Sequence, residues 1–154
     1  MTAARAQIRM ADVSAKPATA RSALARCEIA LSAETLTLLR DGKLPKGDVL
    51  ATAQVAGILA AKKTSDLIPL CHPIAIDRVE LHQMFRDDAL IVEAEVTTTA
   101  PTGPEMEALT AAAAAALTVY DMCKTVEPGI EIRALYLVRK TGGKSGLWER
   151  ERCV

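Results

Sequence analysis

Apolar and polar residues alternate in four stretches of the chain, 23–31, 79–85, 90–97 and 130–138. Strict alternation is typical of β-strands that bury one face, so each stretch predicts a strand. Residues 86–88, Arg-Asp-Asp, separate the second stretch from the third and predict a hairpin turn. The sequence therefore predicts four strands, of which the middle two are neighbours.

Three helices are predicted between these strands. Ser32 can cap a short helix, and Asp48 can cap a second helix over 49–63. The third helix, 102–124, is the longest and is rich in alanine. The intervening segment 64–73 contains two prolines and predicts an ordered loop.

The predicted order is strand, helices, strand, strand, helix, strand. This is the split β-α-β arrangement of an α+β fold, the ferredoxin-like sandwich, in which helices pack on one face of an antiparallel sheet. We expect residues 1–20 to form a flexible N-terminal arm, 21–140 a single ferredoxin-like domain, and 141–154 a mobile glycine-rich tail.

The last strand predicts contact between subunits. Leu135 and Leu137 are expected to share the face opposite Ile132 and Tyr136. A lone two-layer domain would leave that apolar surface in water. We therefore expect subunits to associate over part of this face.

Composition narrows the possible partners. The chain has 154 residues, half of them hydrophobic, which suits one domain with an adequate core. Its 19 basic and 19 acidic residues cancel, so the overall charge favours neither nucleic acid nor an anionic membrane. One Phe, two Tyr and one Trp are too few for a platform that stacks single-stranded bases. We expect no nucleic-acid or membrane partner.

The four cysteines, Cys27, Cys71, Cys123 and Cys153, form no C-x-x-C pair and have no histidine at metal-ligand spacing. The N-terminus lacks an ordinary apolar secretory segment, and the apolar run at 111–116 is too short to span a membrane. Reduced thiols in the cytoplasm are the expectation, and no metal ligands are assigned.

The long helix carries chemically active residues at both ends and almost none between. Glu105, Met106 and Glu107 lie in its first turn, and Asp121 and Lys124 lie in its last. From the rise of an α-helix, the two groups are roughly 20 Å apart. One small pocket in one protomer could hardly use both.

Each end of this helix also has an ordinary structural explanation. Thr102-x-x-Glu105 matches a capping box, which would satisfy helix N–H groups without any ligand. Asp121 opposes the helix dipole. It forms either a solvated ion pair with Lys124 or part of a coupled acid and base in a cleft.

Cys71 and His72 are adjacent in the apolar segment 67–73. Adjacent side chains in an extended segment point to opposite sides, which disfavours a nucleophilic Cys-His pair. A zinc site would need further ligands that the sequence does not supply at recognisable spacing. His72 is better explained as a hydrogen-bond partner or proton carrier for a substrate, whereas His82 fits the polar face of a strand.

The glycine-rich stretch 140–146, KTGGKSG, lacks the first glycine of a Walker loop and the helix that follows one. It could cradle a phosphate through backbone N–H groups and Lys144, or it could be a flexible tail. A polyanionic ligand needs several cations to converge. Loops and helix ends offer Lys16, Arg21, Lys46, Lys63, Lys124 and Lys144.

Four segments together resemble the MoaC family of molybdenum cofactor biosynthesis. They are DVSAK at 12–16, KGDVLATAQVAGILAAKKT at 46–64, DLIPLCHP at 66–73 and TGPEMEALTAAAAAALTVYDMCK at 102–124, and GGKSG at 142–146 fits with them. The resemblance spans nearly the whole chain. It implies a ferredoxin-like phosphorus–oxygen lyase that converts a cyclised dihydroguanosine triphosphate to cyclic pyranopterin monophosphate and releases diphosphate.

The resemblance also implies roles for individual residues. The family's acid–base pair maps onto Asp121 and Lys124, with Lys46 as a further catalytic lysine. Positive charge around the leaving diphosphate would come from Arg21, Lys46, Lys124 and Lys144. The expected substrate-binding residues are Leu70, Cys71, His72, Glu105, Met106, Glu107, Arg21 and Lys144, with Glu105 or Glu107 holding the guanine-derived ring.

By the same resemblance the protein is a homohexamer, a trimer of dimers, with sites at subunit boundaries. No cofactor is expected, although a Mg²⁺ ion could accompany the triphosphate. Many relatives carry a Lys where this chain has Pro101, so a phosphate contact from that position is absent. Two other functions stay open: a non-catalytic nucleotide-binding domain, and an inactive scaffold for a partner enzyme.

Overall fold

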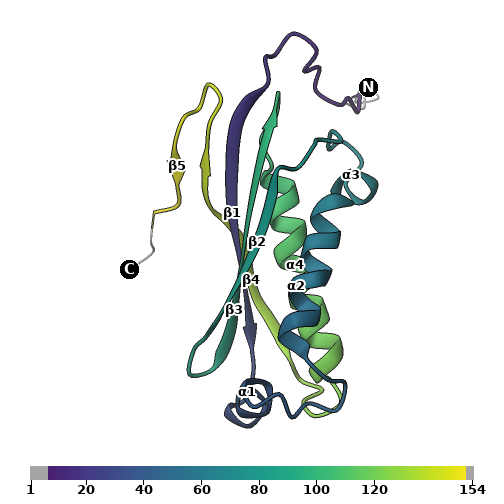
Figure 1. Cartoon of the computed structure of the whole chain (residues 1–154), viewed down its shortest axis with the longest axis vertical. Helices are drawn as coiled ribbons and strands as arrows, with labels where there is room; N and C mark the ends of the chain where they lie inside the picture. The colour runs from purple at the N-terminus through teal and green to yellow at the C-terminus, as the bar shows by residue number, and fades with distance from the viewer. Residues whose placement is uncertain (1–6, 152–154) are drawn as a thin grey trace, which may run out of the picture.

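The computed structural model describes residues 7–151, which form five strands and four helices (Figure 1). The strands are β1 (Thr19–Ala30), β2 (Arg78–Phe85), β3 (Ala89–Ala100), β4 (Glu131–Thr141) and β5 (Trp148–Glu149). The helices are α1 (Ala33–Arg40), α2 (Val49–Lys62), α3 (Thr64–Leu67) and α4 (Glu105–Cys123). Every predicted strand and helix is present, and β5 and the single turn of α3 are additional.

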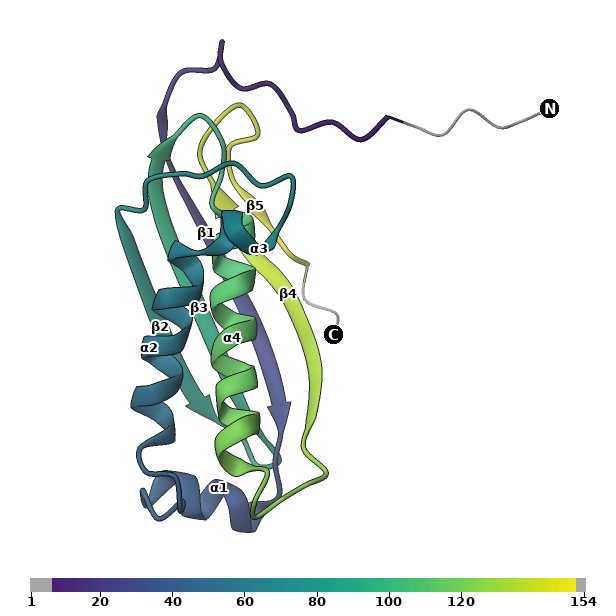
Figure 2. The same cartoon turned by 90° about the vertical axis from the view of Figure 1, so that its right-hand side faces the viewer.

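The five strands form one antiparallel sheet in the order β2-β3-β1-β4-β5. The first four strands have the arrangement of two interleaved β-α-β units, so the predicted ferredoxin-like α+β fold is confirmed. α2 and α4 lie side by side on one face of the sheet, and α1 lies across one end (Figures 1 and 2). The other face carries no helix from residues 7–151.

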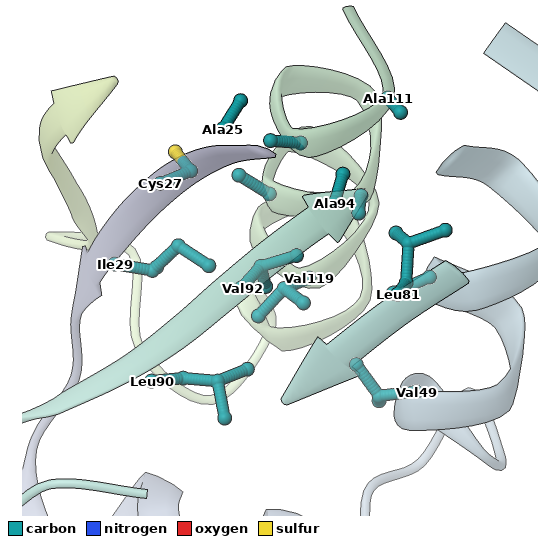
Figure 3. Packing of buried hydrophobic residues seen from close by; sticks show 14 of the residues in the cluster. Ala25, Cys27, Ile29, Val49, Leu81, Leu90, Val92, Ala94, Ala111 and Val119 are labelled. Carbon is teal, nitrogen blue, oxygen red and sulfur yellow. The ribbon is translucent and has the colours of Figure 1, made fainter. Parts of the chain in front are cut away.

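Alternation along β1 creates the centre of the core. Ala23, Ala25, Cys27 and Ile29 are buried and share one face of β1, as predicted; Figure 3 shows the last three of them beside the helices. Their partners on β3 extend the same buried surface and are Val96, Ala94, Val92 and Leu90. Removing this apolar surface from water stabilises the fold by roughly 25 cal/mol for each Å².

The small residues of α4 and α2 allow these helices to pack closely. The fully buried residues of α4 are Ala108, Ala111, Ala112, Ala115, Ala116, Val119 and Cys123. On α2, a Cβ at Gly57 would overlap the Leu81 side chain and would lie 3.0 Å from the carbonyl oxygen of Ala111. Gly57 is therefore required for the close approach of α2 to both α4 and β2.

Two of the three predicted helix caps are confirmed. The Ser32 side chain accepts a hydrogen bond from the N–H of Thr35, and Asp48 caps α2 in the same way. The capping box, which was one of two explanations offered for Glu105, does not form, because Pro104 occupies the N-cap position and no side chain caps α4. Glu105 consequently has no capping role.

The predicted faces of β4 are partly wrong because register shifts interrupt its pairing with β1. Ile132, Leu135 and Leu137 all lie opposite buried residues of β1 and therefore share the helix side of the sheet. Tyr136 pairs with Arg26 on the opposite, open face. Leu135 is nevertheless 45% exposed, whereas Leu137 is partly buried against the core, so one of the two leucines does expose apolar surface, on the helix side rather than on the open face.

Ion pairs line the open face of the sheet instead. Arg26 pairs with Glu93, and Arg139 lies 3.0 Å from Glu95. Two hollows on this face, of about 500 and 970 Å³, share Arg26 and Arg86 in their walls. No predicted site residue lines either hollow, so the predicted site lies elsewhere.

The expected tail begins inside β4 and continues into β5, which pairs with β4 at the edge of the sheet. Residues 1–6 and 152–154 of the expected arm and tail, including Cys153, lie outside the described residues. The mobility of arm and tail stays a prediction. Cys27, Cys71 and Cys123 are free thiols, and no helix within 7–151 is long and apolar enough to cross a membrane.

Candidate functional site

The loop before α2 brings Lys46 to the C-terminal end of α4. Lys46 Nζ lies 2.8 Å from Asp121 Oδ2 and donates to the Asp121 backbone carbonyl at 2.9 Å. Lys124 Nζ lies 2.7 Å from Asp121 Oδ1. One carboxylate therefore joins two ammonium groups from distant segments. The structure brings together all three residues predicted to be catalytic, and we call them the lysine–aspartate cluster.

The two lysines explain why a carboxylate is tolerated in the last turn of a helix. Their positive charges offset the unfavourable interaction between Asp121 and the helix dipole, and Lys46 satisfies a free carbonyl at the helix end. All three side chains are partly exposed, so a ligand can reach them.

The contacts in the lysine–aspartate cluster favour the charged forms of Asp121 and Lys124. Hydrogen bonds from Lys124 and then Lys46 lower the pKa of Asp121 to about 2. The hydrogen bond with Asp121 raises the pKa of Lys124. At neutral pH Lys124 is therefore protonated and Asp121 is a carboxylate, so Lys124 is the member of this pair that carries a proton.

A different cluster lies at the N-terminal end of α4. The Glu107 side chain is only 2% exposed, and Cys71 Sγ donates to its Oε1 at 3.5 Å. Glu107 Oε2 is buried with no hydrogen-bond partner in the described structure. A buried oxygen without a partner costs free energy, so a ligand that donates a hydrogen bond here would be stabilised.

Burial changes the chemistry of both members of this contact. It raises the pKa of Glu107. It also raises the pKa of the Cys71 thiol to about 11, and the charge of Glu107 adds to that rise. Because the thiolate is the nucleophilic form, Cys71 is a hydrogen-bond donor rather than a nucleophile near neutral pH.

Glu105 is close to Glu107 in sequence but has different surroundings. Its Oε1 lies 3.0 Å from Lys140 Nζ, and its carboxylate folds back over Gly103. This ion pair ties the start of α4 to β4. Lys140 was not predicted as a site residue, because its contact with Glu105 joins two elements that are 35 residues apart in the sequence.

Arg21 lies at the start of β1 and contacts two loops. Its Nε donates to the carbonyl of Ala100 at 3.0 Å, and its Nη2 donates to the carbonyl of Pro101 at 3.2 Å. Gly142 and Gly143 pack against Arg21 as well. The sequence predicted Arg21 as a phosphate contact and did not indicate these protein contacts.

His72 lies near the N-terminal DVSAK turn. A hydrogen bond from the N–H of Ser14 lowers the pKa of Asp12, and the charge of His72 contributes weakly in the same direction. The described part of the N-terminal arm and the segment that follows α3 lie at the same end of the molecule (Figure 1).

The remaining predicted binding residues come from three different segments. Leu70 is exposed in the segment after α3, and Met106 is partly buried in the first turn of α4. Lys144 is exposed in the loop between β4 and β5. We use the name binding cluster for the predicted binding residues at this end: Arg21, Leu70, Cys71, His72, Glu105, Met106, Glu107 and Lys144.

The two clusters lie at opposite ends of α4. The lysine–aspartate cluster is next to α1, and the binding cluster is next to α3 (Figures 1 and 2). The helix rise from Glu107 to Asp121 is roughly 20 Å. The structure therefore brings the predicted site residues together as two groups, and one chain does not present both groups to one small ligand.

The fold and these clusters define a class: a ferredoxin-like α+β protein with a carboxylate shared by two lysines at one end of α4 and a buried glutamate at the other. Residues 10–143 match the profile of the MoaC family, and the chain belongs to that family.

Similar proteins cover almost the whole chain. A protein of Thermomicrobium roseum named cyclic pyranopterin monophosphate synthase is 54% identical over 149 residues, which is 96% of this chain and 90% of that protein. Proteins with the same name from Listeria welshimeri and Peptoclostridium acidaminophilum are 54% and 50% identical. Each covers 93% of this chain, and the chain covers 90% and 91% of their lengths.

Proposed function

We propose that the lysine–aspartate cluster performs the proton transfers of the reaction for which the relatives are named. The chain forms cyclic pyranopterin monophosphate and acts as a lyase in molybdenum cofactor biosynthesis. Its substrate is the cyclised dihydroguanosine triphosphate, and diphosphate is released. The observation that carries the assignment of roles is the Asp121 carboxylate shared by Lys46 and Lys124.

Protonation states determine what each member of the cluster can do. Asp121 stays a carboxylate and orients both ammonium groups. Lys124 donates a proton to the opening ring, and the neutral amine it leaves can accept a proton in a later step. Lys46 adds positive charge where the α-phosphate is attacked and the diphosphate leaves.

The binding cluster supports recognition of the guanine-derived ring. The ring presents N–H donors, and Glu107 Oε2 is a buried acceptor without a partner in the described structure. With only four aromatic residues in the chain, hydrogen bonds rather than stacking hold the ring. Cys71 and Glu107 therefore face the ring, and Lys144 supplies charge for the triphosphate.

We also propose that the active protein is a homohexamer, a trimer of dimers, in which different protomers bring the two clusters together. The separation along α4 supports shared sites, since one substrate cannot bridge roughly 20 Å within a chain. Exposed apolar side chains on the helix layer support association: Val55 and Leu59 lie one turn apart on α2, and Leu117 lies on α4.

Mixing two inactive variants tests the shared site. Lys124→Ala disables the lysine–aspartate cluster, and Glu107→Ala disables the binding cluster. A hybrid oligomer that contains both variants regains activity only if one site takes the two residues from different chains. Recovery after denaturing and refolding the mixture supports the proposal. Equilibrium sedimentation that shows an active monomer would exclude it.

Any Mg²⁺ ion is held by the triphosphate rather than by a protein cage. Within residues 7–151, no three His, Cys, Asp or Glu side chains are arranged to hold a metal ion. Phosphate oxygens with one or two carboxylates are a common way to bind Mg²⁺. Titrating Mg²⁺ into chelator-treated protein with and without the triphosphate tests this, because binding that needs no triphosphate would contradict it.

A cytoplasmic location is part of the proposal, and the three free thiols are consistent with it. Cell fractionation with an antibody against the chain would test the location directly.

Diphosphate release from the cyclised dihydroguanosine triphosphate tests the central proposal. We expect turnover by the wild-type protein and its loss in Lys124→Ala and Asp121→Asn. Lys43→Ala is the control, because Lys43 forms a similar exposed ion pair with Asp41 at 3.0 Å outside the cluster. Binding without turnover by wild type would favour a nucleotide-binding domain, and neither binding nor turnover would favour a scaffold.

A further inference from the structure

The Arg21 guanidinium joins three segments near the binding cluster. Two of its N–H donors are used by the carbonyls of Ala100 and Pro101, which precede α4. A guanidinium has five N–H donors in a planar fork, so it can hold two neighbouring carbonyls in a fixed relation. Through these bonds β1 fixes the path of the chain into the first turn of α4.

The third segment is the glycine-rich loop after β4. Gly143 has φ +67° and lies so close to Arg21 that an added Cβ would overlap Nη1 and lie 2.8 Å from Cζ. Gly142 has φ +90° and packs on the β1 backbone at Ala20 and Arg21. The loop can lie against the guanidinium only because these two positions lack a side chain.

The segments that meet at Arg21 lead directly to ligand-binding residues. Pro101 is followed by Glu105 and Glu107, whereas Gly143 is followed by Lys144. A change in the distance between these segments would move the ring-binding carboxylate relative to the positive charge for the triphosphate. The ion pair between Lys140 and Glu105 joins the same two segments a second time.

We propose that Arg21 is a positioning residue: it fixes the segment 100–103, which runs from the end of β3 toward α4, and the loop at 142–146 relative to each other. This inference rests on the proposed function for its link to catalysis. It differs from the phosphate contact expected from the sequence, because the Nε–Nη2 edge of the guanidinium, which forms a bidentate fork, is engaged with protein backbone. Arg21 acts on the substrate through Glu107 and Lys144.

Two substitutions of Arg21 separate positioning from charge. Arg21→Lys keeps the positive charge but lacks the fork that holds two carbonyls. We expect Arg21→Lys and Arg21→Ala to raise KM by similar factors, on the order of tenfold to a hundredfold, with a smaller change in kcat. A phosphate ligand would behave differently, because Lys binds phosphate well and would restore most of the loss seen with Ala.

The glycines provide a matched pair for the same question. Gly143→Ala and Gly146→Ala impose a similar backbone strain, since their φ angles are +67° and +62°. Only an Ala at 143 meets Arg21, because nothing lies within 4 Å of a Cβ at 146. We expect Gly143→Ala to raise KM several-fold more than Gly146→Ala, and we expect this excess to disappear in an Arg21→Ala background.

Arg139→Ala is the control for losing an arginine from the neighbouring strand, since Arg139 pairs with Glu95 on the open face. Recovery of activity in Arg21→Lys, or an excess for Gly143→Ala that persists without Arg21, would overturn the proposal. If Arg21→Ala fails to fold, Arg21→Lys, which lacks the Nη1 atom that an Ala at 143 would meet, serves as the background for the two glycine variants.

Hydrogen–deuterium exchange tests the positioning role without any substrate. We expect Arg21→Ala to speed amide exchange in both 102–106 and 142–146 while leaving 119–123 at the other end of α4 unchanged. Unchanged exchange in either loop would refute the tie between them. If wild-type protein releases no diphosphate, the proposed function fails, but this exchange result stands or falls independently.

Discussion

Lys46 and Asp121 are 75 residues apart in the sequence and form an ion pair of 2.8 Å at the end of α4. With Lys124 on the other carboxylate oxygen, this contact determines the charge state of the cluster. The pKa of Asp121 is about 2 because both lysines donate to it, Lys124 more strongly.

We predict that removing either lysine raises the pKa of Asp121. The rise should be larger in Lys124→Met than in Lys46→Met, and the double variant should approach the ordinary Asp value of about 3.9. Carbon-detected NMR of the Asp121 carboxyl during an acid titration measures this. A carboxyl that titrates near its ordinary pKa in wild type would show that the cluster does not form in solution.

The same pKa has a defined consequence for stability. Because the folded-state pKa of Asp121 is below its unfolded value, its stabilising effect is present above about pH 4 and is lost as pH falls toward 2. Asp121→Asn should therefore flatten the acid limb of a plot of stability against pH. Urea unfolding between pH 2 and pH 6 checks this, with Asp41→Asn as the control for an exposed pair elsewhere.

The effect of Glu107 on the pH dependence of stability should be opposite to that of Asp121. Burial raises its pKa, so the folded state binds the proton more tightly than the unfolded state and stability increases as pH falls toward the raised pKa. We predict that Glu107→Gln raises Tm at pH 8, by about 2–4 °C for each kcal/mol gained, and that this advantage shrinks at lower pH. Calorimetry across pH measures it. A lower Tm at pH 8 would mean that the carboxylate has a stabilising partner.

Gly57→Ala should destabilise the fold although alanine favours helices. A Cβ there overlaps Leu81 and crowds the Ala111 carbonyl, which is backbone and cannot move aside easily. We expect the steric overlap to lower the free energy of unfolding by about 1–3 kcal/mol. The higher helix propensity of alanine offsets at most about 1 kcal/mol of this loss. Urea unfolding measures the net effect, and Ala51→Gly on the exposed side of α2 calibrates the propensity term. An increase in stability would show that α2 does not pack this closely.

The sequence predicted those features that depend on local spacing. Alternation identified the buried face of β1, and Ser32 and Asp48 were recognised as caps because a cap and its N–H partner are only three residues apart. The faces of β4 were mispredicted because a register shift depends on pairing with a distant strand, which alternation cannot reveal.

In the candidate site, too, the sequence predicted the local contact but not the contacts between distant segments. Asp121 and Lys124 are three residues apart on one helix, so their contact follows from helix geometry. The position of Lys46 beside Asp121 depends on how the loop before α2 folds, and only the family resemblance indicated that these residues belong to one site. Neither spacing nor resemblance indicated the contacts of Lys140 and Arg21, because both join segments distant in sequence.

Glu105 and Glu107 should respond differently to loss of charge, which decides which of them holds the ring. Glu105 is engaged by Lys140 at 3.0 Å, whereas Glu107 has a buried oxygen without a partner in the described structure. We predict that Glu107→Gln raises KM on the order of tenfold or more, as expected when a buried hydrogen-bond partner is changed, and that Glu105→Gln has a much smaller effect. Steady-state kinetics of diphosphate release measures both. Exchanging the charges in Glu105→Lys with Lys140→Glu should restore much of the stability that either single change removes, because the ion pair is rebuilt in reverse. A Glu105→Gln variant as impaired as Glu107→Gln would instead place Glu105 on the substrate and make Lys140 its positioning partner.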